Sequence, residues 1–146
     1  VNDEARPGEY NDVEDYRENH FQHAPAGYHY LLVSTEVAYK GEEYYAGAGE
    51  PGTAIVESYD RDGIMASLVL HELGHSFGLD RSDEGVDARE YSQTAYQSVM
   101  NYNALYEMTT YSDGEDEVGR NEWRYVAENR HQPTIENGAD GCPAIP

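Results

Sequence analysis

Basic residues are scarce in this chain of 146 residues. Nine lysines and arginines stand against 29 aspartates and glutamates, the formal net charge is −20, and Lys40 is the one lysine. Such a surface repels the phosphate backbone of nucleic acids and the headgroups of anionic membranes. The composition therefore predicts no nucleic-acid partner and no membrane partner.

Cysteine and long apolar runs are also nearly absent. The single cysteine, Cys142, cannot form a disulfide within the chain. No apolar run approaches the roughly 20 residues that a membrane-spanning helix needs. No signal peptide is visible at the start, but a mature secreted protein has lost that segment. An extracellular, secreted protein is the location that we expect.

Acidic residues are abundant in the chain and are interleaved with 14 tyrosines, apolar runs and glycine turns. Acidic composition can indicate disorder, but this interleaving favours a folded protein. Salt screens charges within about 3 Å at 1 M, so a folded domain can carry this charge in concentrated salt. The composition resembles that of proteins from extreme halophiles. We therefore expect the protein to unfold when the salt is diluted.

The length predicts one domain over residues 1–146, with loose tails at 1–11 and 133–146, and we expect a monomer. The run Leu31-Leu32-Val33 indicates a strand that is buried on both faces. The elements expected in the first part of the chain are a helix at 12–22, a strand at 28–39, a glycine-rich loop at 40–52 that can include an edge strand, and a strand at 53–58.

A buried helix should follow from Ile64 to Phe77, because apolar residues cover more than one of its faces. Asp62 suits its N-cap, and Gly78 suits a left-handed turn at its end. Residues 80–97 are polar and irregular. Ser112 and Glu115 have capping-box spacing, which predicts a C-terminal helix reaching about residue 130.

The buried helix carries His71-Glu72-Leu73-Gly74-His75. Residues four apart project from the same helix face, so both imidazoles can bind one Zn²⁺. Glu72 is then placed to take a proton from metal-bound water. The alternative is a helix with two hydrogen-bonded histidines and a solvated glutamate. Burying these groups without partners would cost several kcal/mol, which favours the metal.

The motif extends to Gly78 and so resembles the metzincin metallopeptidases, whose signature is HExxHxxGxxH followed by a methionine-containing turn. Ser98-Val99-Met100-Asn101-Tyr102 resembles that turn. The resemblance implies that Met100 forms an apolar floor under the metal and that Tyr102 ligates it or helps to stabilise the oxyanion. The alternative role for Met100 and Tyr102 is ordinary core packing.

The resemblance also implies a fold. We expect an α+β, zincin-like domain: a small twisted mixed sheet packed on the active-site helix, with a C-terminal helix. In metzincins an edge strand above the cleft binds the substrate by strand addition. Residues 46–56 are the expected counterpart.

The resemblance fails at the third ligand, where the family pattern points to position 81 and this chain has Arg81. A guanidinium has no lone pair to offer a metal. Asp87, which follows a glycine turn, is our first choice of third ligand, and Asp80 is the alternative. Behind these two, the sequence leaves open Asp83, Glu84, a distant histidine such as His29, and a site without a third ligand.

The function predicted from the sequence is a zinc-dependent endopeptidase that acts on a protein or peptide substrate. Zn²⁺ is the expected cofactor, Glu72 the general base and Tyr102 the oxyanion partner. Arg81 prompts an alternative, a catalytically inactive zincin that serves as a binding module. A zinc hydrolase acting on something other than peptides is a third hypothesis, which the methionine-turn resemblance disfavours.

Overall fold

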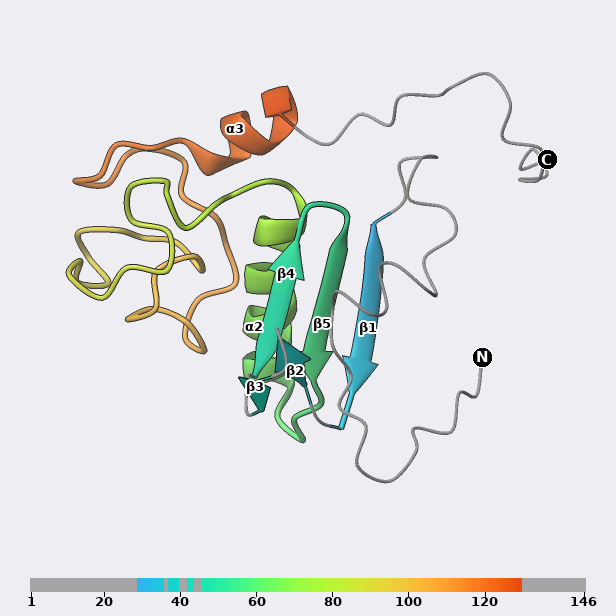
Figure 1. Ribbon diagram of the computed structural model, residues 1–146. Coiled ribbons are helices and arrows are strands. Elements are labelled where there is room, and N and C mark those ends of the chain that lie inside the picture. Colours follow the sequence, from blue (N-terminus) through green and yellow to red (C-terminus); the bar gives the residue numbers. More distant parts are fainter. Residues whose placement is uncertain (1–28, 36, 40–41, 44–45, 130–146) are drawn as a thin grey trace, which may run out of the picture.

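The computed structural model describes residues 29–35, 37–39, 42–43 and 46–129. The predicted helix at 12–22 and both predicted tails lie outside these residues. The described part is a small α+β fold (Figure 1). Its elements are β1 (Tyr30–Ser34), β2 (Ala38–Tyr39), β3 (Glu42–Glu43), β4 (Gly47–Glu50), β5 (Thr53–Glu57), α2 (Asp62–Ser76) and α3 (Glu122–Asn129).

The main sheet has three strands in the order β1-β5-β4. β1 runs parallel to β5, and β4 runs antiparallel to it, so the sheet is mixed as expected. Pro51 and Gly52 connect β4 to β5; the fixed φ of proline and the positive φ of 86° at Gly52 suit this tight turn. β2 and β3 form a separate antiparallel pair.

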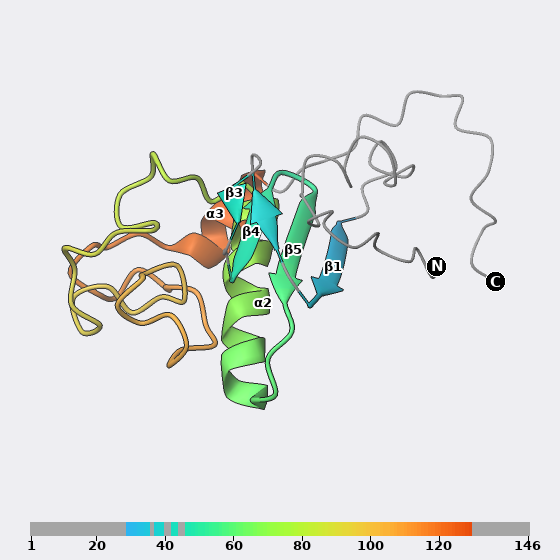
Figure 2. The same cartoon turned by 60° about the horizontal axis from the view of Figure 1, so that its bottom comes forward.

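The first strand differs from the prediction. It ends at Ser34, and the chain pairs again only at Ala38. Leu31 and Val33 are 39% and 51% exposed, so burial on both faces is wrong for this strand. The physical reason is that α2 packs against β4 and β5 and lies away from β1 (Figures 1 and 2).

Helix α2 is the helix predicted at Ile64 to Phe77, but the expected burial of its apolar residues is wrong, because Leu68 is the one large apolar residue of the helix that is fully buried. The ends of the helix follow from local chemistry. Arg61, with an extended φ of −150°, occupies the N-cap without a side-chain cap bond, so the prediction of Asp62 as N-cap is wrong. Asp62 instead lies in the first turn, where a carboxylate favours the helix dipole. At the other end Gly78 has a φ of 97°, which confirms the left-handed turn.

The sheet and the helix approach closely because β4 contains glycines. A Cβ at Gly49 would lie 2.4 Å from the backbone oxygen of Glu72, and one at Gly47 would lie 2.6 Å from the Glu72 carboxylate. Both distances are too short for any side chain. Glycine in this strand therefore lets one face of β4 lie directly against the histidine-bearing part of α2.

The segment between the helices, residues 77–121, has no helix or strand of its own among the described elements, apart from one bridge between Asp113 and Asn121. It lies beside α2 on the side away from β1 (Figures 1 and 2). Much of the buried core is here: Leu79, Val86, Tyr96, Val99, Met100 and Tyr111.

The C-terminal helix begins ten residues later than predicted, at Glu122 instead of Ser112. Ser112 and Glu115 do not form the expected capping box. The Ser112 hydroxyl bonds to Asp116, and its backbone N–H bonds to Glu122 at 2.8 Å. Among the described residues no helix is both long and apolar enough to cross a bilayer.

Candidate metal centre

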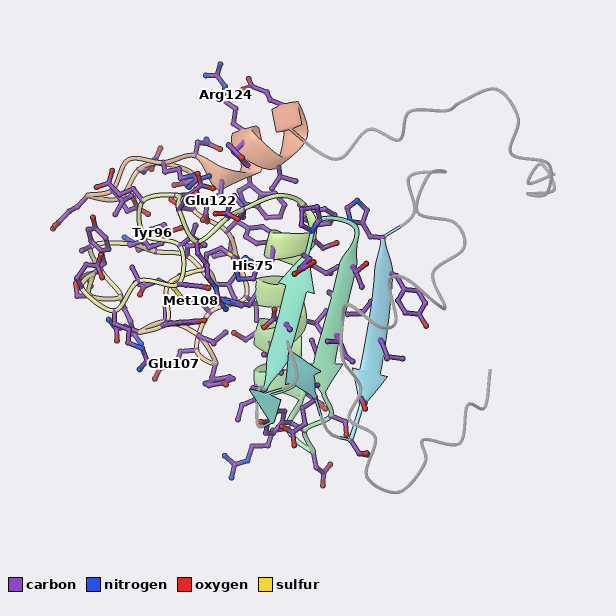
Figure 3. The ribbon with its side chains drawn as sticks, viewed as in Figure 1. His75, Tyr96, Glu107, Met108, Glu122 and Arg124 are labelled. Carbon is purple, nitrogen blue, oxygen red and sulfur yellow. The ribbon has the colours of Figure 1, made fainter. Side chains whose placement is uncertain are left out.

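His71 and His75 lie one turn apart on α2, as the spacing predicts. Both are buried, and their ring centroids are 5.0 Å apart. His75 lies on the side of α2 that faces segment 77–121 (Figure 3). The helix therefore directs both rings at this irregular segment.

One nitrogen of each ring is committed to the backbone. Nδ1 of His71 lies 2.9 Å from the carbonyl oxygen of Val99, and Nδ1 of His75 lies 2.7 Å from that of Leu79. A carbonyl only accepts, so each Nδ1 carries the hydrogen. In a neutral imidazole this leaves a lone pair on each Nε2, the arrangement that a metal ligand needs.

Asp87 completes the group. Its Oδ1 lies 3.1 Å from Nε2 of His71 and 3.2 Å from Nε2 of His75. The buried Oδ1 accepts no hydrogen bond, while Oδ2 forms an ion pair with Arg81. Three lone-pair atoms therefore converge, and neutral histidines leave no hydrogen between them. This arrangement requires a cation, either a proton or a metal ion.

The backbone directs Asp87 into this position. Its φ of 58° lies in the left-handed region, which aspartate tolerates better than most residues. Its N–H donates to the carbonyl of Met100 at 2.9 Å. Gly85 before it has a φ of 88° and rests on the Tyr96 ring, where a Cβ would lie 2.7 Å away. The glycine turn expected from the sequence is thus formed.

The pKa shifts of Asp87 and His71 both favour the charged forms of these side chains. Burial acts to raise the pKa of Asp87, but the two histidines outweigh it and hold that pKa far below its usual range. Burial likewise acts to lower the pKa of His71, but Asp87 and Glu72 outweigh it and raise that pKa. In the absence of metal, a proton shared with Asp87 is therefore the competing cation.

The donor set suits zinc. Within the described residues, His71, His75 and Asp87 form the one group of three metal-type donors, with ligand atoms all within 4.8 Å of one another. Bonds of about 2.0–2.1 Å in a tetrahedral zinc site place neighbouring ligand atoms about 3.3 Å apart. The two nitrogen–oxygen distances come close to this value. Two imidazoles and a carboxylate, with one position left for water, is a composition found in catalytic zinc sites.

Arg81, at the position where the family has a ligand, takes a different role. Its Nε lies 2.5 Å from Oδ2 of Asp87 as an ion pair, on the side of the carboxylate away from the histidines. Asp80 is turned away, because its Oδ1 accepts the backbone N–H of Ser82 at 2.8 Å. The structure thus brings Asp87, and not Asp80, to the histidines.

The remaining acids and histidine left open by the sequence are engaged elsewhere. Asp83 pairs with Arg120 at 2.8 Å, and Glu84 accepts the hydroxyl of Tyr91 at 3.0 Å. His29 lies 2.7 Å from the Ser76 hydroxyl and packs edge-on against Phe77. None of these three belongs to the donor group.

Glu72 lies between α2 and β4. It is 5% exposed, and its carboxylate faces Gly47. Burial raises its pKa, while the nearby charges of His71 and His75 oppose the rise. A buried carboxylate with a raised pKa beside a metal site suits a general base.

Met100 is fully buried against α2 at Gly74. A Cβ at Gly74 would lie 2.4 Å from its sulfur, so the glycine leaves the space that Met100 fills. Met100 thus takes part in the core cluster and also adjoins the metal group through Asp87. Met100 is therefore a core residue, and the floor role that the resemblance implies stays a prediction.

Tyr102 stacks on His71 with ring centroids 5.5 Å apart, and the guanidinium of Arg89 lies 5.2 Å from the centre of the Tyr102 ring. Burial first, and then the Asp87 charge, raise its pKa to about 12, so the phenol keeps its proton at neutral pH. With Asp87 and Arg81, Tyr102 lines a pocket of about 420 Å³.

A second pocket, of about 470 Å³, lies along β4. It is lined by residues 47–51 and by His75 and residues 78–81. Arg81 lines both pockets, while Asp87 lines the first and His75 the second. Each pocket therefore borders one residue of the donor group.

Comparisons with protein-family models, curated proteins and solved structures find no match for this chain. What the site does is therefore inferred from its own residues. Two features of the site could not be predicted from the sequence. The carbonyls of Val99 and Leu79 carry no side-chain signal, and Arg81 looked like a defect where it is a partner of Asp87.

Proposed function

We propose that the protein is a zinc-dependent endopeptidase with a zincin-like, metzincin-type active site. The observation that carries the proposal is the convergence of three lone-pair atoms, on His71, His75 and Asp87, with both Nδ1 hydrogens used elsewhere. A divalent cation satisfies all three at once. The buried carboxylate of Glu72 lies beside them and can serve as a general base, which a purely structural metal site does not need.

Each residue has a task in such a reaction. When bound, zinc would polarise the scissile carbonyl and lower the pKa of a water molecule. Glu72 is placed to accept a proton from water and would deliver it to the leaving amine. Tyr102, which keeps its phenolic proton, donates a hydrogen bond to the developing oxyanion.

The substrate side of the proposal rests on β4. Within the described residues this strand pairs with β5 on one side, and it borders the 470 Å³ pocket next to His75. An extended peptide can add to such an edge through backbone hydrogen bonds. That geometry favours cleavage inside a chain over removal of a terminal residue.

The first test is zinc content by elemental analysis in molar salt, with casein hydrolysis alongside. We expect one zinc per chain in the wild type and in Asp80→Ala, and loss of zinc and activity in Asp87→Ala. Zinc loss in Asp80→Ala instead would refute the ligand assignment. A wild type without zinc would refute the metal site altogether.

The alternative, an inactive zincin that serves as a binding module, retains support from Arg81 at the family's ligand position. The two functions differ in the role of Glu72. We expect Glu72→Gln to keep zinc and lose hydrolysis. A wild type that holds zinc but cleaves no peptide bond in casein or in a peptide library would favour the binding module.

A further inference from the structure

A buried carboxylate outside the metal group, that of Glu122, collects three hydrogen bonds. The residue is 0% exposed although it is the first residue of α3. Its Oε1 accepts the hydroxyl of Tyr96, and its Oε2 accepts the hydroxyl of Ser98 and the N–H of Ser112. Tyr96 and Glu122 lie together at the α3 end of the irregular segment (Figure 3).

This arrangement is stable only as a whole, because a buried carboxylate needs its hydrogen bonds. The N-terminal end of α3 adds a favourable dipole. Glu122 therefore fixes the positions of its three hydrogen-bond donors. Of these donors, Ser98 is the one that also bonds to the segment next to the metal group.

The Ser98 hydroxyl connects Glu122 to the backbone of the residues that follow. Its hydroxyl donates to Glu122 and accepts the N–H of Met100 at 3.0 Å. A serine hydroxyl that bonds the N–H two residues on closes a tight turn. The direction of the hydroxyl, and with it the shape of residues 98–100, is thus set by Glu122.

The backbone of residues 98–100 holds two of the three metal-type donors. The carbonyl of Val99 accepts Nδ1–H of His71, and the carbonyl of Met100 accepts the N–H of Asp87, both at 2.9 Å. An unbroken series of buried contacts therefore runs from Glu122 to His71 and Asp87.

We propose that Glu122 is a positioning residue of the metal centre, which through Ser98 aims the two carbonyls that orient His71 and Asp87. The inference rests on the proposed metal site and extends it. Groups that orient metal ligands typically change metal affinity by about 10–100-fold when they are removed. We expect a loss of that size on disrupting the series.

Tyr96 provides an internal comparison. Tyr96→Phe removes one hydrogen bond to Glu122, as Ser98→Ala does, but it leaves in place the bond from the Met100 N–H to the Ser98 hydroxyl and the ring against which Gly85 packs. Both variants should lose stability. Only Ser98→Ala should also disturb the metal centre. Glu128→Gln, on the exposed side of the same helix, is the matched control for Glu122→Gln.

The experiment measures zinc affinity by competition with a chromophoric chelator in molar salt. The visible spectrum of the Co²⁺-substituted protein is recorded as well, because it reports ligand geometry. Circular dichroism establishes that each variant is folded. We expect Glu122→Ala and Ser98→Ala to lose about 10–100-fold in zinc affinity with altered spectra. Glu122→Gln should recover part of the loss, and Tyr96→Phe and Glu128→Gln should match the wild type.

Wild-type affinity and spectrum in folded Glu122→Ala or Ser98→Ala would overturn the inference and leave Glu122 a stabilising residue only. If Glu122→Ala does not fold, the test is the zinc affinity of Ser98→Ala compared with that of Tyr96→Phe. Equal zinc affinities in these two variants would overturn the inference. A wild type that binds neither metal would instead refute the proposed function.

Discussion

The guanidinium of Arg81 lies 2.5 Å from Oδ2 of Asp87, while Oδ1 of the same carboxylate faces both histidines. The two oxygens thus have separate partners. One carboxylate therefore joins the two histidines of α2 to an arginine of the segment that follows the helix. The pairing leaves Oδ1 as the oxygen available to a metal.

Arg81→Gln should weaken zinc binding by about 10–100-fold, because the outer oxygen of Asp87 loses the charge that orients it. A competition assay against a chromophoric chelator measures the change. Arg124→Gln is the control, since Arg124 forms an exposed pair with Glu128 and should behave as wild type. Unchanged affinity in Arg81→Gln would assign Arg81 to the surface and not to the site.

Gly74→Ala should destabilise the fold by about 1–3 kcal/mol, because its Cβ would lie 2.4 Å from the buried sulfur of Met100. Gly63→Ala in the same helix is the control: its Cβ meets nothing within 4 Å, so it should stabilise by about 0.5–1 kcal/mol. Chemical denaturation in molar salt compares the two. Equal midpoints would show that Met100 does not need this space.

Gly47→Ala should lower kcat while leaving zinc bound. The new Cβ would lie 2.6 Å from Oε1 of Glu72, so the carboxylate has to move. A displacement of about 1 Å in a reacting group can lower the rate about 10²-fold. Casein hydrolysis and zinc content, measured on the same preparation, test this. A variant with normal kcat would remove Glu72 from the role of base.

Zinc removal should destabilise the wild type but not Asp87→Ala. A ligand that binds only the folded state adds about 4 kcal/mol when its free concentration is a thousand times Kd. Chelator titrations followed by chemical denaturation in constant salt measure the difference. Equal chelator effects on both proteins would point to a metal held elsewhere.

Dilution from molar salt into dilute buffer should unfold the protein, because a net charge of −20 is then no longer screened. Far-UV circular dichroism across a series of salt concentrations follows the transition. A sucrose series at equal water activity is the control for osmotic effects. A spectrum that is unchanged on dilution contradicts the halophile-like interpretation.

The local sequence pattern was enough to predict two strands followed by the helix that carries the histidines. The apolar spacing from Ile64 to Phe77 predicts a helix, and a spacing of four places His71 and His75 on one face of any helix. Gly78 ended that helix as predicted, because a residue without Cβ favours the left-handed turn. The acidity of the surface is likewise a property of composition.

The tertiary structure decided what depends on contacts between distant segments. Local pattern left Asp80 and Asp87 open; the turn at Gly85 on the Tyr96 ring and the Met100 carbonyl direct Asp87 inward. The start of α3 also depended on distant partners, since Tyr96, Ser98 and Ser112 all donate to Glu122. Residue types and spacing therefore specified the two histidines, and packing of an irregular segment specified their partner.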